Sequence, residues 1–144
     1  MLTVDFNSVE APERFPGLKA GFPLSSAAGA AALATVWIEV APGGVLPEHT
    51  DSAEELLFVV EGEVEATVGD ETGTLGPLEL AVVPALAPHG LRNVSDRPAR
   101  ILGVFASSTA VSVFTEAFGP DALQVFVIGA PLELAVPLPE PIAA

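Results

Sequence analysis

Four side chains in the sequence could hold a metal ion or exchange protons: His49, Asp51, Glu55 and His89. The two histidines are the only ones in the chain. Because residues two apart on a strand point to the same face, His49 and Asp51 would present an imidazole and a carboxylate together. Glu55 opens an apolar run, where a carboxylate without a partner would be costly to bury. Imidazoles and carboxylates are the ligands of divalent metal sites that use no thiolate, so this set predicts such a site.

The segments that must position these side chains have the pattern of short β-strands separated by glycine and proline. Residues 63–69 show it most clearly, because acidic or polar residues alternate there with valine and alanine. Several such runs at spacings near ten residues predict an all-β sandwich or barrel, and the length suits one domain over residues 1–144. The expected strands are residues 35–41, 55–61, 63–69, 72–75, 79–83, 89–94, 99–105, 111–115 and 124–128.

Four other segments carry weaker signals. Residues 20–38 have no charge, but proline, serine and glycine interrupt them, so we expect an Ala-rich loop before a core strand rather than a membrane helix. Gly62 predicts a tight turn that joins its two flanking runs as a hairpin. At most a short turn of helix fits residues 116–123. The tail from Ala130 holds four prolines in 15 residues and is expected to be extended or loosely attached.

Two linked motifs in the sequence resemble those of the cupin superfamily. In the first, Gly43 is followed after five residues by His49, after one more by Asp51, after three by Glu55 and after six by Gly62. In the second, Pro84 is followed by a short turn, His89, three residues and Asn93. The resemblance covers residues 35–105, and the flanks match only in their general strand pattern.

This resemblance implies a single cupin-type jelly-roll β-barrel that holds a divalent metal inside. The implied ligands are His49, Asp51, Glu55 and His89, with Asp51 where the family usually has a second histidine. If Asp51 reaches the metal, two imidazoles and two carboxylates favour Fe²⁺ or Mn²⁺ over Cu²⁺, with Zn²⁺ or Ni²⁺ as alternatives. If it falls short, two histidines and Glu55 form the facial triad of non-haem iron oxygenases. A third outcome is a site that binds nothing.

Other polar and aromatic residues are interpreted as structural. Glu48 and Glu54 should face away from the site by strand parity. For Asp51, the alternative to metal ligation is a role as a turn-forming residue or as a residue outside the ligand shell. The remaining positions are interpreted as follows: Glu61, Glu63 and Glu65 as solvated; Arg92 and Arg100 as partners of surface acids rather than anchors of an anionic ligand; Trp37, Phe58 and Phe105 as core rather than pocket walls; Gly62 and Asn93 as turn and backbone contacts.

Composition narrows the choice of partners. The formal charge of −14 repels phosphate backbones and anionic membrane surfaces, so we expect neither nucleic acid nor membrane as a partner. The chain has no cysteine, which excludes disulfides and thiolate metal sites but does not fix the compartment. It begins without a basic signal region, and we expect a cytoplasmic protein. Half of the residues are hydrophobic and the mean hydropathy is +0.54, so an exposed apolar face and a homodimer are expected.

Three functions are compatible with these residues. The first is a metal-dependent enzyme acting on a small organic molecule, with a dioxygenase of an enol or phenol as the leading reaction and an isomerase or lyase also open. In that reading Glu55 is the catalytic acid or base. The second is a non-catalytic module that binds a metal or a small molecule. The third is a structural barrel without a ligand.

Overall fold

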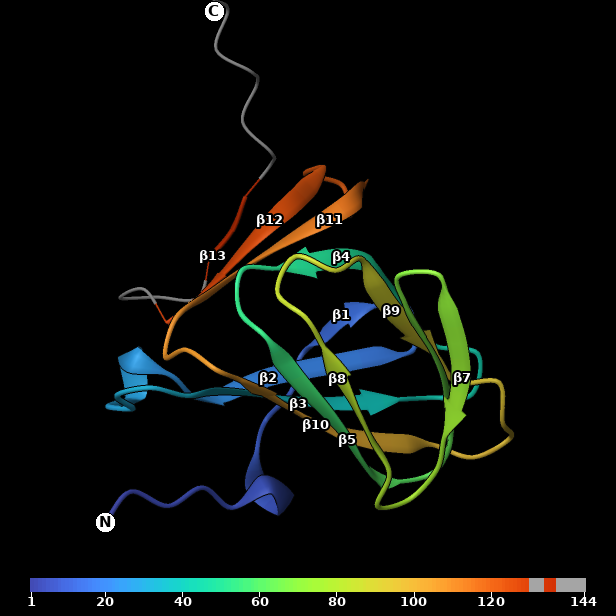
Figure 1. The fold of residues 1–144 in the computed structure, drawn as a ribbon, viewed down its shortest axis with the longest axis horizontal. Coiled ribbons are helices and arrows are strands. Elements are labelled where there is room, and N and C mark those ends of the chain that lie inside the picture. Colours follow the sequence, from blue (N-terminus) through green and yellow to red (C-terminus); the bar gives the residue numbers. More distant parts are fainter. Residues whose placement is uncertain (130–133, 137–144) are drawn as a thin grey trace, which may run out of the picture.

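The computed structural model describes residues 1–129 and 134–136, which form two antiparallel sheets packed face to face as a jelly-roll barrel (Figure 1). Two short 3-10 helices, η1 (Phe6–Ser8) and η2 (Ser26–Ala28), lie near the N-terminus. The first sheet has the order β1 (Glu13–Phe15), β2 (Leu18–Leu24), β3 (Ala34–Val40), β10 (Ala99–Phe105), β5 (Glu55–Glu61) and β8 (Leu80–Val83). The second has the order β13 (Leu134–Val136), β12 (Leu123–Ile128), β11 (Ala110–Phe118), β4 (Val45–Asp51), β9 (His89–Arg92), β6 (Val64–Val68) and β7 (Glu71–Leu75).

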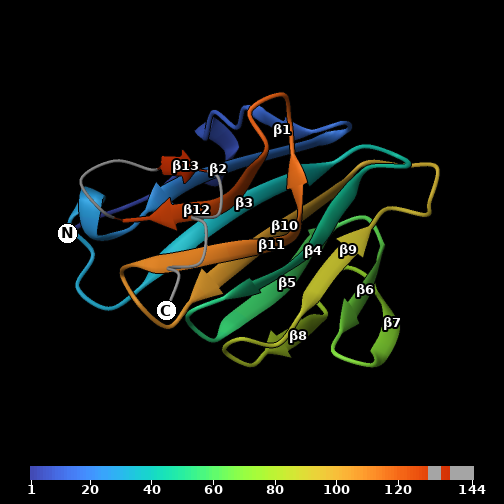
Figure 2. The ribbon, with the colours of Figure 1, turned by 90° about the horizontal axis from the view of Figure 1, so that it is seen from above.

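The core lies between the two sheets and follows the alternation of the strands. On β10, Ala99, Ile101 and Phe105 are buried, whereas Leu102 and Val104 on the opposite face are only half-buried. Fully burying an aliphatic or aromatic side chain contributes about 1.5–3 kcal/mol, so the inward positions supply most of the stabilisation. Figure 2 shows β12 and β13 at one end of the second sheet and β6 and β7 at the other, with β4 and β11 between them.

The expected hairpin at Gly62 is wrong, because β5 and β6 lie in different sheets. Strand β5 pairs with β10 and β8, and β6 pairs with β7 and β9. Gly62 has a φ of 81°, and a Cβ atom there would lie 2.5 Å from the carbonyl oxygen of Pro98. The residue is therefore structural, as expected, but it turns the chain from one sheet to the other.

The expected loop before residue 34 begins with a strand instead. Residues Leu18–Leu24 form β2, which pairs with β3 from Leu18 opposite Val40 to Leu24 opposite Thr35. The small residues Ala20 and Gly21 lack the β-branched and aromatic character that marks the other strands, which hid this strand in the sequence. Over the residues placed by the structure, no helix is long and apolar enough to cross a membrane.

The described part of the C-terminal region forms strands. At most a short turn of helix is compatible with the sequence of residues 116–123, and the structure has none there, because residues 116–118 continue β11 and are followed by a turn to β12. Of the tail expected to be extended, residues Leu134–Val136 form β13, which pairs with β12. The rest of that tail lies outside the described residues.

Candidate metal centre

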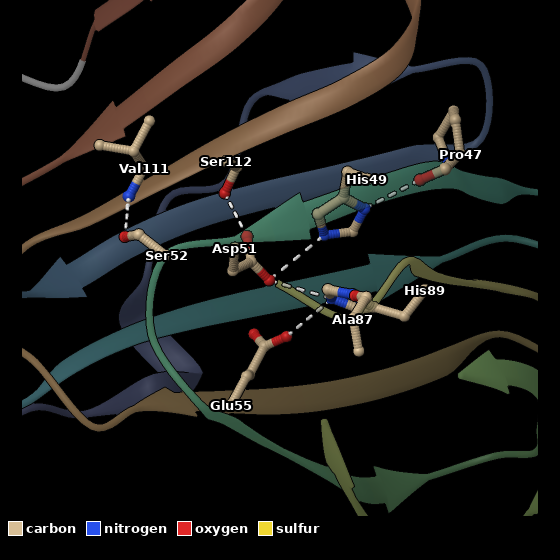
Figure 3. Close-up of polar contacts among 9 residues, drawn as sticks. All are labelled: Pro47, His49, Asp51, Ser52, Glu55, Ala87, His89, Val111 and Ser112. Atoms are coloured by element: carbon tan, nitrogen blue, oxygen red, sulfur yellow. Dashed lines mark hydrogen bonds and ion pairs between the residues drawn. The ribbon is translucent and has the colours of Figure 1, made fainter. Parts of the chain in front are cut away.

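Three strands bring the four sequence-predicted side chains to one place inside the barrel (Figure 3). His49 and Asp51 end β4, Glu55 is the first residue of β5, and His89 is the first residue of β9. Strands β4 and β9 pair with His49 directly opposite His89. All four side chains are buried, with exposed fractions between 1% and 6%.

The polar atoms of His49, Asp51 and His89 converge on a common point, and Glu55 lies beside His89. Oδ2 of Asp51 lies 3.0 Å from Nε2 of His89 and 3.6 Å from Nε2 of His49. Oε1 of Glu55 lies 3.4 Å from Nε2 of His89. Ligand atoms of His49, Asp51 and His89 all lie within 4.8 Å of one another, which makes these three a candidate metal-binding group.

Both imidazole rings are held by the same kind of backbone contact. Nδ1 of His49 lies 2.9 Å from the carbonyl oxygen of Pro47, and Nδ1 of His89 lies 2.9 Å from that of Ala87. A carbonyl only accepts a hydrogen bond, so each Nδ1 donates its proton. When a ring is neutral, its Nε2 lone pair is directed into the site, which is the arrangement of metal-ligating histidines.

Two buried atoms at the centre have no hydrogen-bond partner, and this tests whether the residues fit a metal. Oδ2 of Asp51 and Nε2 of His89 are close to each other, but their directions do not form a hydrogen bond. Buried polar groups without a partner are costly and rare. A cation between Oδ2 and the two Nε2 atoms would satisfy them, so the donor set fits a divalent ion.

Burial and proximity shift the pKa values of the four groups in different directions. Burial lowers the pKa of His49. Burial would also lower the pKa of His89, but the carboxylates of Asp51 and Glu55 outweigh it and raise this pKa to about 10. Burial raises the pKa of Glu55 to about 7. Burial opposes ionisation of Asp51, yet the two histidines and Ser112 prevail and lower its pKa. Without a metal, the positive charge of protonated His89 therefore compensates the negative charge of the neighbouring carboxylates.

Two supporting residues were not found from the sequence. The hydroxyl of Ser112 on β11 donates a hydrogen bond to Oδ1 of Asp51, which leaves Oδ2 directed at the histidines. Gly103 on β10 makes room for Glu55, because a Cβ atom there would lie 2.5 Å from Oε2. Ser112 had one weak signal in the sequence, since it is a polar residue on the inward face between Ala110 and Phe114.

A cavity of about 260 Å³ between the sheets reaches this centre. His49, Glu55 and Ser112 belong to its wall, and the remaining wall is mainly aromatic and aliphatic. Asp51 and His89 are not among the residues that line it. A small molecule in the cavity would therefore approach the centre from the side of His49 and Glu55.

Comparison with known proteins supports the family that the motifs suggest. Residues 36–105 match the family described as Cupin domain, and the fold recurs among solved cupin-type structures. The chain belongs to the cupin superfamily. A comparison with curated proteins found no match.

Three solved structures are similar to this cupin chain. The polyketide cyclase RemF from Streptomyces resistomycificus is 28% identical, with 73% of this chain and 78% of that chain covered and a TM-score of 0.63. TT1209 from Thermus thermophilus is 34% identical over 54% of this chain and 75% of that chain, with a TM-score of 0.52. Oxalate decarboxylase from Lactobacillus farciminis, in its formate complex, is 23% identical over 76% of this chain, with a TM-score of 0.69. The cupin chain spans about a third of that enzyme's length, since 34% of it is covered.

The acidic neighbours of the centre lie where strand parity placed them. Glu54 is exposed and Glu55 is buried, and Glu48 is exposed and accepts a hydrogen bond from Thr115. Glu61 and Glu63 are exposed, and Glu65 is partly so. Arg92 and Arg100 pair with surface acids, as the sequence predicts. Arg92 lies 2.9 Å from Glu65, and Arg100 lies 3.7 Å from Glu61.

The aromatic residues considered for the cavity divide into two groups. Trp37 is buried on the outer side of β3, against Phe6 and beneath the guanidinium of Arg100. Phe58 is half-buried and does not line the cavity, whereas Phe105 belongs both to the core and to the cavity wall. Asn93 is structural, as expected, because its side-chain amide donates to the carbonyls of Val40 and Arg97.

Proposed function

We propose that this cupin is a metal-dependent enzyme that acts on a small organic molecule. One observation carries the proposal: Oδ2 of Asp51 and Nε2 of both histidines point to one buried spot at the wall of an apolar cavity. Buried ligand atoms beside a cavity are what a metal-dependent reaction on a small molecule requires.

His49, Asp51 and His89 would hold the ion, and Glu55 would act beside it. Two imidazoles and a carboxylate favour Fe²⁺ or Mn²⁺, with Zn²⁺ or Ni²⁺ as alternatives. A bound divalent ion supplies either oxygen activation or polarisation of a carbonyl or enolate oxygen. Glu55 lies on the cavity wall, 3.4 Å from His89, where it can become a fourth ligand or carry a proton to or from the substrate.

Oxidation of an enol or phenol by O₂ is the reaction that we propose first. A shell of two histidines and one carboxylate leaves positions open for oxygen and substrate. A redox-neutral reaction is the second candidate, because RemF is named a polyketide cyclase and is 28% identical over 73% of this chain. An isomerase or lyase would use the same centre to polarise a carbonyl oxygen.

The ligand set is tested by metal analysis of protein purified without chelator. Replacing His89 by Ala should reduce bound metal to background. The substitution removes one ligand, and it also removes the imidazole that lies 3.0 Å from Oδ2 of Asp51. Glu48→Gln is the matched control, since Glu48 is exposed next to His49 and should leave metal content unchanged. Full metal stoichiometry in His89→Ala would refute the proposed ligands.

The reaction is tested by oxygen uptake with Fe²⁺-loaded protein over a panel of enols, phenols and diketones. Uptake that depends on both metal and substrate supports the oxygenase. Substrate conversion under nitrogen supports the redox-neutral reaction instead. Tight binding of these compounds without conversion in either atmosphere would contradict the enzyme and favour a non-catalytic binding module.

We also propose a homodimer that covers the outer face of the first sheet. Strand pairing places Phe58 between Leu80 and Leu102, and Leu56 between Val82 and Val104. Leu80 and Val82 on β8, the last strand of that sheet, are 47% and 53% exposed. A continuous apolar face of this kind is typical of an interface rather than of free surface.

A further inference from the structure

The cavity beside the candidate metal centre is rich in phenylalanine, which supplies a third of its lining residues and shares the wall with aliphatic side chains. Six of the eight phenylalanines in the chain line it, although they come from both sheets and from distant parts of the sequence. Such a concentration sets the chemistry that the cavity can accept, because the chain has no tyrosine that could add a hydroxyl group to an aromatic wall. The six are Phe15, Phe22, Phe105, Phe114, Phe118 and Phe126.

Five of the six phenylalanine rings form two groups on the cavity wall. Phe15, Phe114 and Phe118 contact one another with ring centroids 4.8–5.3 Å apart. Phe22 and Phe126 stack at 4.9 Å, and the guanidinium of Arg14 lies over both. A planar ring that enters between the sheets would meet aromatic faces and edges, which favours an aromatic ligand beyond the effect of its buried area.

The volume of the cavity sets the size of the ligand. A dry cavity of about 150 Å³ lined by apolar side chains holds one benzene ring. The 260 Å³ found here is less than twice that volume, so it accommodates about two fused rings.

Polar contacts are concentrated where the cavity meets the metal centre. His49, Glu55 and Ser112 are each buried there, and the ring of His49 stacks on Phe114 with centroids 4.8 Å apart. A ring placed against Phe114 would therefore have one edge next to the imidazole of His49. The cavity wall has two further polar side chains, Glu13 and Arg14 on β1. A sugar or another polyhydroxylated ligand would lose more hydrogen bonds to water than this wall can replace.

We propose that the cavity binds a planar, largely apolar molecule of about two fused rings, with a hydroxyl or enol oxygen at the edge that faces His49 and Glu55. The placement of the ligand's oxygen rests on the proposed function, because that oxygen is directed to the metal. The placement of the ligand's rings does not depend on the proposed function. The rings are selected by the aromatic and aliphatic wall alone. The two parts can therefore be tested separately.

Naphthalene and 2-naphthol are the probes, measured by equilibrium dialysis against metal-free and Mn²⁺-loaded protein. Naphthalene should bind both forms equally, because it uses only the wall. The hydroxyl of 2-naphthol should increase affinity for the loaded form at least about tenfold over the metal-free form, as expected for a polar contact to a charged centre. Glucose, of similar size but polar, should not compete with either probe.

Two variants locate the binding in this cavity. Ala20 is buried and lines it, so Ala20→Leu fills the space and should abolish naphthalene binding. Phe22→Leu removes a ring from the wall without filling the cavity and should weaken binding roughly three- to tenfold. Phe6→Leu is the matched control, because Phe6 contacts Trp37 away from the cavity, and it should bind as wild type does. Thermal unfolding of each variant verifies that it is folded.

The outcomes separate this inference from the proposed function. Metal binding without any naphthalene binding would overturn the ring assignment and leave the metal centre standing. Naphthalene binding that survives Ala20→Leu in folded protein would also overturn it, because the probe would then lie elsewhere. Equal affinity of 2-naphthol for both forms of a protein that does bind Mn²⁺ would overturn the orientation of the oxygen. Naphthalene binding by a protein that takes no metal would support the ring assignment and refute the metal centre.

Discussion

A single carboxylate oxygen, Oδ2 of Asp51, connects the two histidines of the candidate centre. Strand parity in the sequence predicts that His49 and Asp51 share a face, and the structure places them so. Sequence reasoning cannot supply the contacts that orient these groups, because they come from other strands or from backbone carbonyls. Ser112 is 61 residues from Asp51 in the chain, and the carbonyls of Pro47 and Ala87 have no side-chain signature.

Replacing Glu55 by Gln separates its role as a proton carrier from a role as a ligand. We expect Glu55→Gln to retain metal and to lose about 10²–10⁴-fold in turnover, because the amide has nearly the same shape but cannot exchange a proton. Metal content and turnover of the purified variant are the measurements. Glu54→Gln is the control and should match wild type, since Glu54 is exposed. Loss of metal from Glu55→Gln would assign Glu55 to the ligands instead.

Metal binding should release protons at neutral and mildly alkaline pH. The pKa of His89 is raised to about 10 in the metal-free protein, so this group is protonated at pH 8 and must lose its proton to become a ligand. Affinity should therefore rise about tenfold per pH unit between pH 7.5 and 9 for each proton released. An imidazole with the ordinary pKa of about 6.5 would give a flat profile in that range.

Calorimetry in buffers of different ionisation enthalpy measures the released protons directly. About one proton per ion is expected at pH 8, from His89. At pH 7 a further fraction should come from Glu55, whose pKa is raised to about 7. Binding of the metal at pH 8 with no proton release would show that the neighbouring carboxylates do not hold His89 in its charged form.

At the scale of elements, the sequence indicates which residues form strands better than it indicates which strands pair. Alternation is a local property, so residues 63–69 could be predicted as a strand from their own pattern. Pairing depends on distant partners, and β5 therefore lies beside β10 rather than beside β6. The position of β2 was missed for a related reason: its small residues pack closely against other segments, as Gly21 does with the carbonyl of Glu10.

Gly103 on β10 shows how one strand position supports the site. A Cβ atom there would lie 2.5 Å from both Oε2 of Glu55 and Cγ1 of Val36, so Gly103→Ala forces one of them to move. We expect a loss of about 1–3 kcal/mol in the free energy of unfolding, as for overpacked cores, measured in urea on metal-free protein.

Gly73→Ala is the control for that substitution. Gly73 also lies on a strand, β7, but a Cβ atom there would meet nothing within 4 Å. The free energy of unfolding should therefore stay within about 1 kcal/mol of wild type, because the added methyl group mainly restricts the unfolded chain. Equal stability of the two variants would show that the space at Gly103 is not needed by Glu55.

At the scale of the molecule, the apolar outer face of the first sheet predicts self-association. Val82→Lys places a charge on the exposed edge strand of this face, opposite Leu56, and should shift the protein from dimer to monomer in sedimentation at micromolar concentration. Val111→Lys, at a residue of β11 that is 38% exposed, should leave the dimer intact. Wild type that sediments as a monomer would contradict the proposed interface.

The composition predicts an apolar surface but not its location, and the two motifs predict the metal centre but not the cavity. Each motif residue is recognised by its spacing to another residue in the same segment. The cavity wall has no such spacing, since Phe15, Phe22 and Phe126 meet only after β1, β2 and β12 are placed around the centre. The nature of the ligand pocket could therefore be inferred only from the folded chain.

Strand β11 contacts the candidate metal centre at two residues, whereas β1, β2 and β12 contribute only to the cavity wall. It supplies Ser112, which fixes Asp51, and Phe114, which stacks on His49, in addition to its part of the cavity wall. Substitutions on β11 would therefore change both the ligand that the cavity accepts and the geometry of the centre, whereas the cavity residues of β1, β2 and β12 do not contact the centre. Directed evolution toward new substrates can therefore vary positions such as Phe22 and Phe126 without disturbing the centre, whereas variants with substitutions at Ser112 or Phe114 on β11 would lose the ion and be selected against.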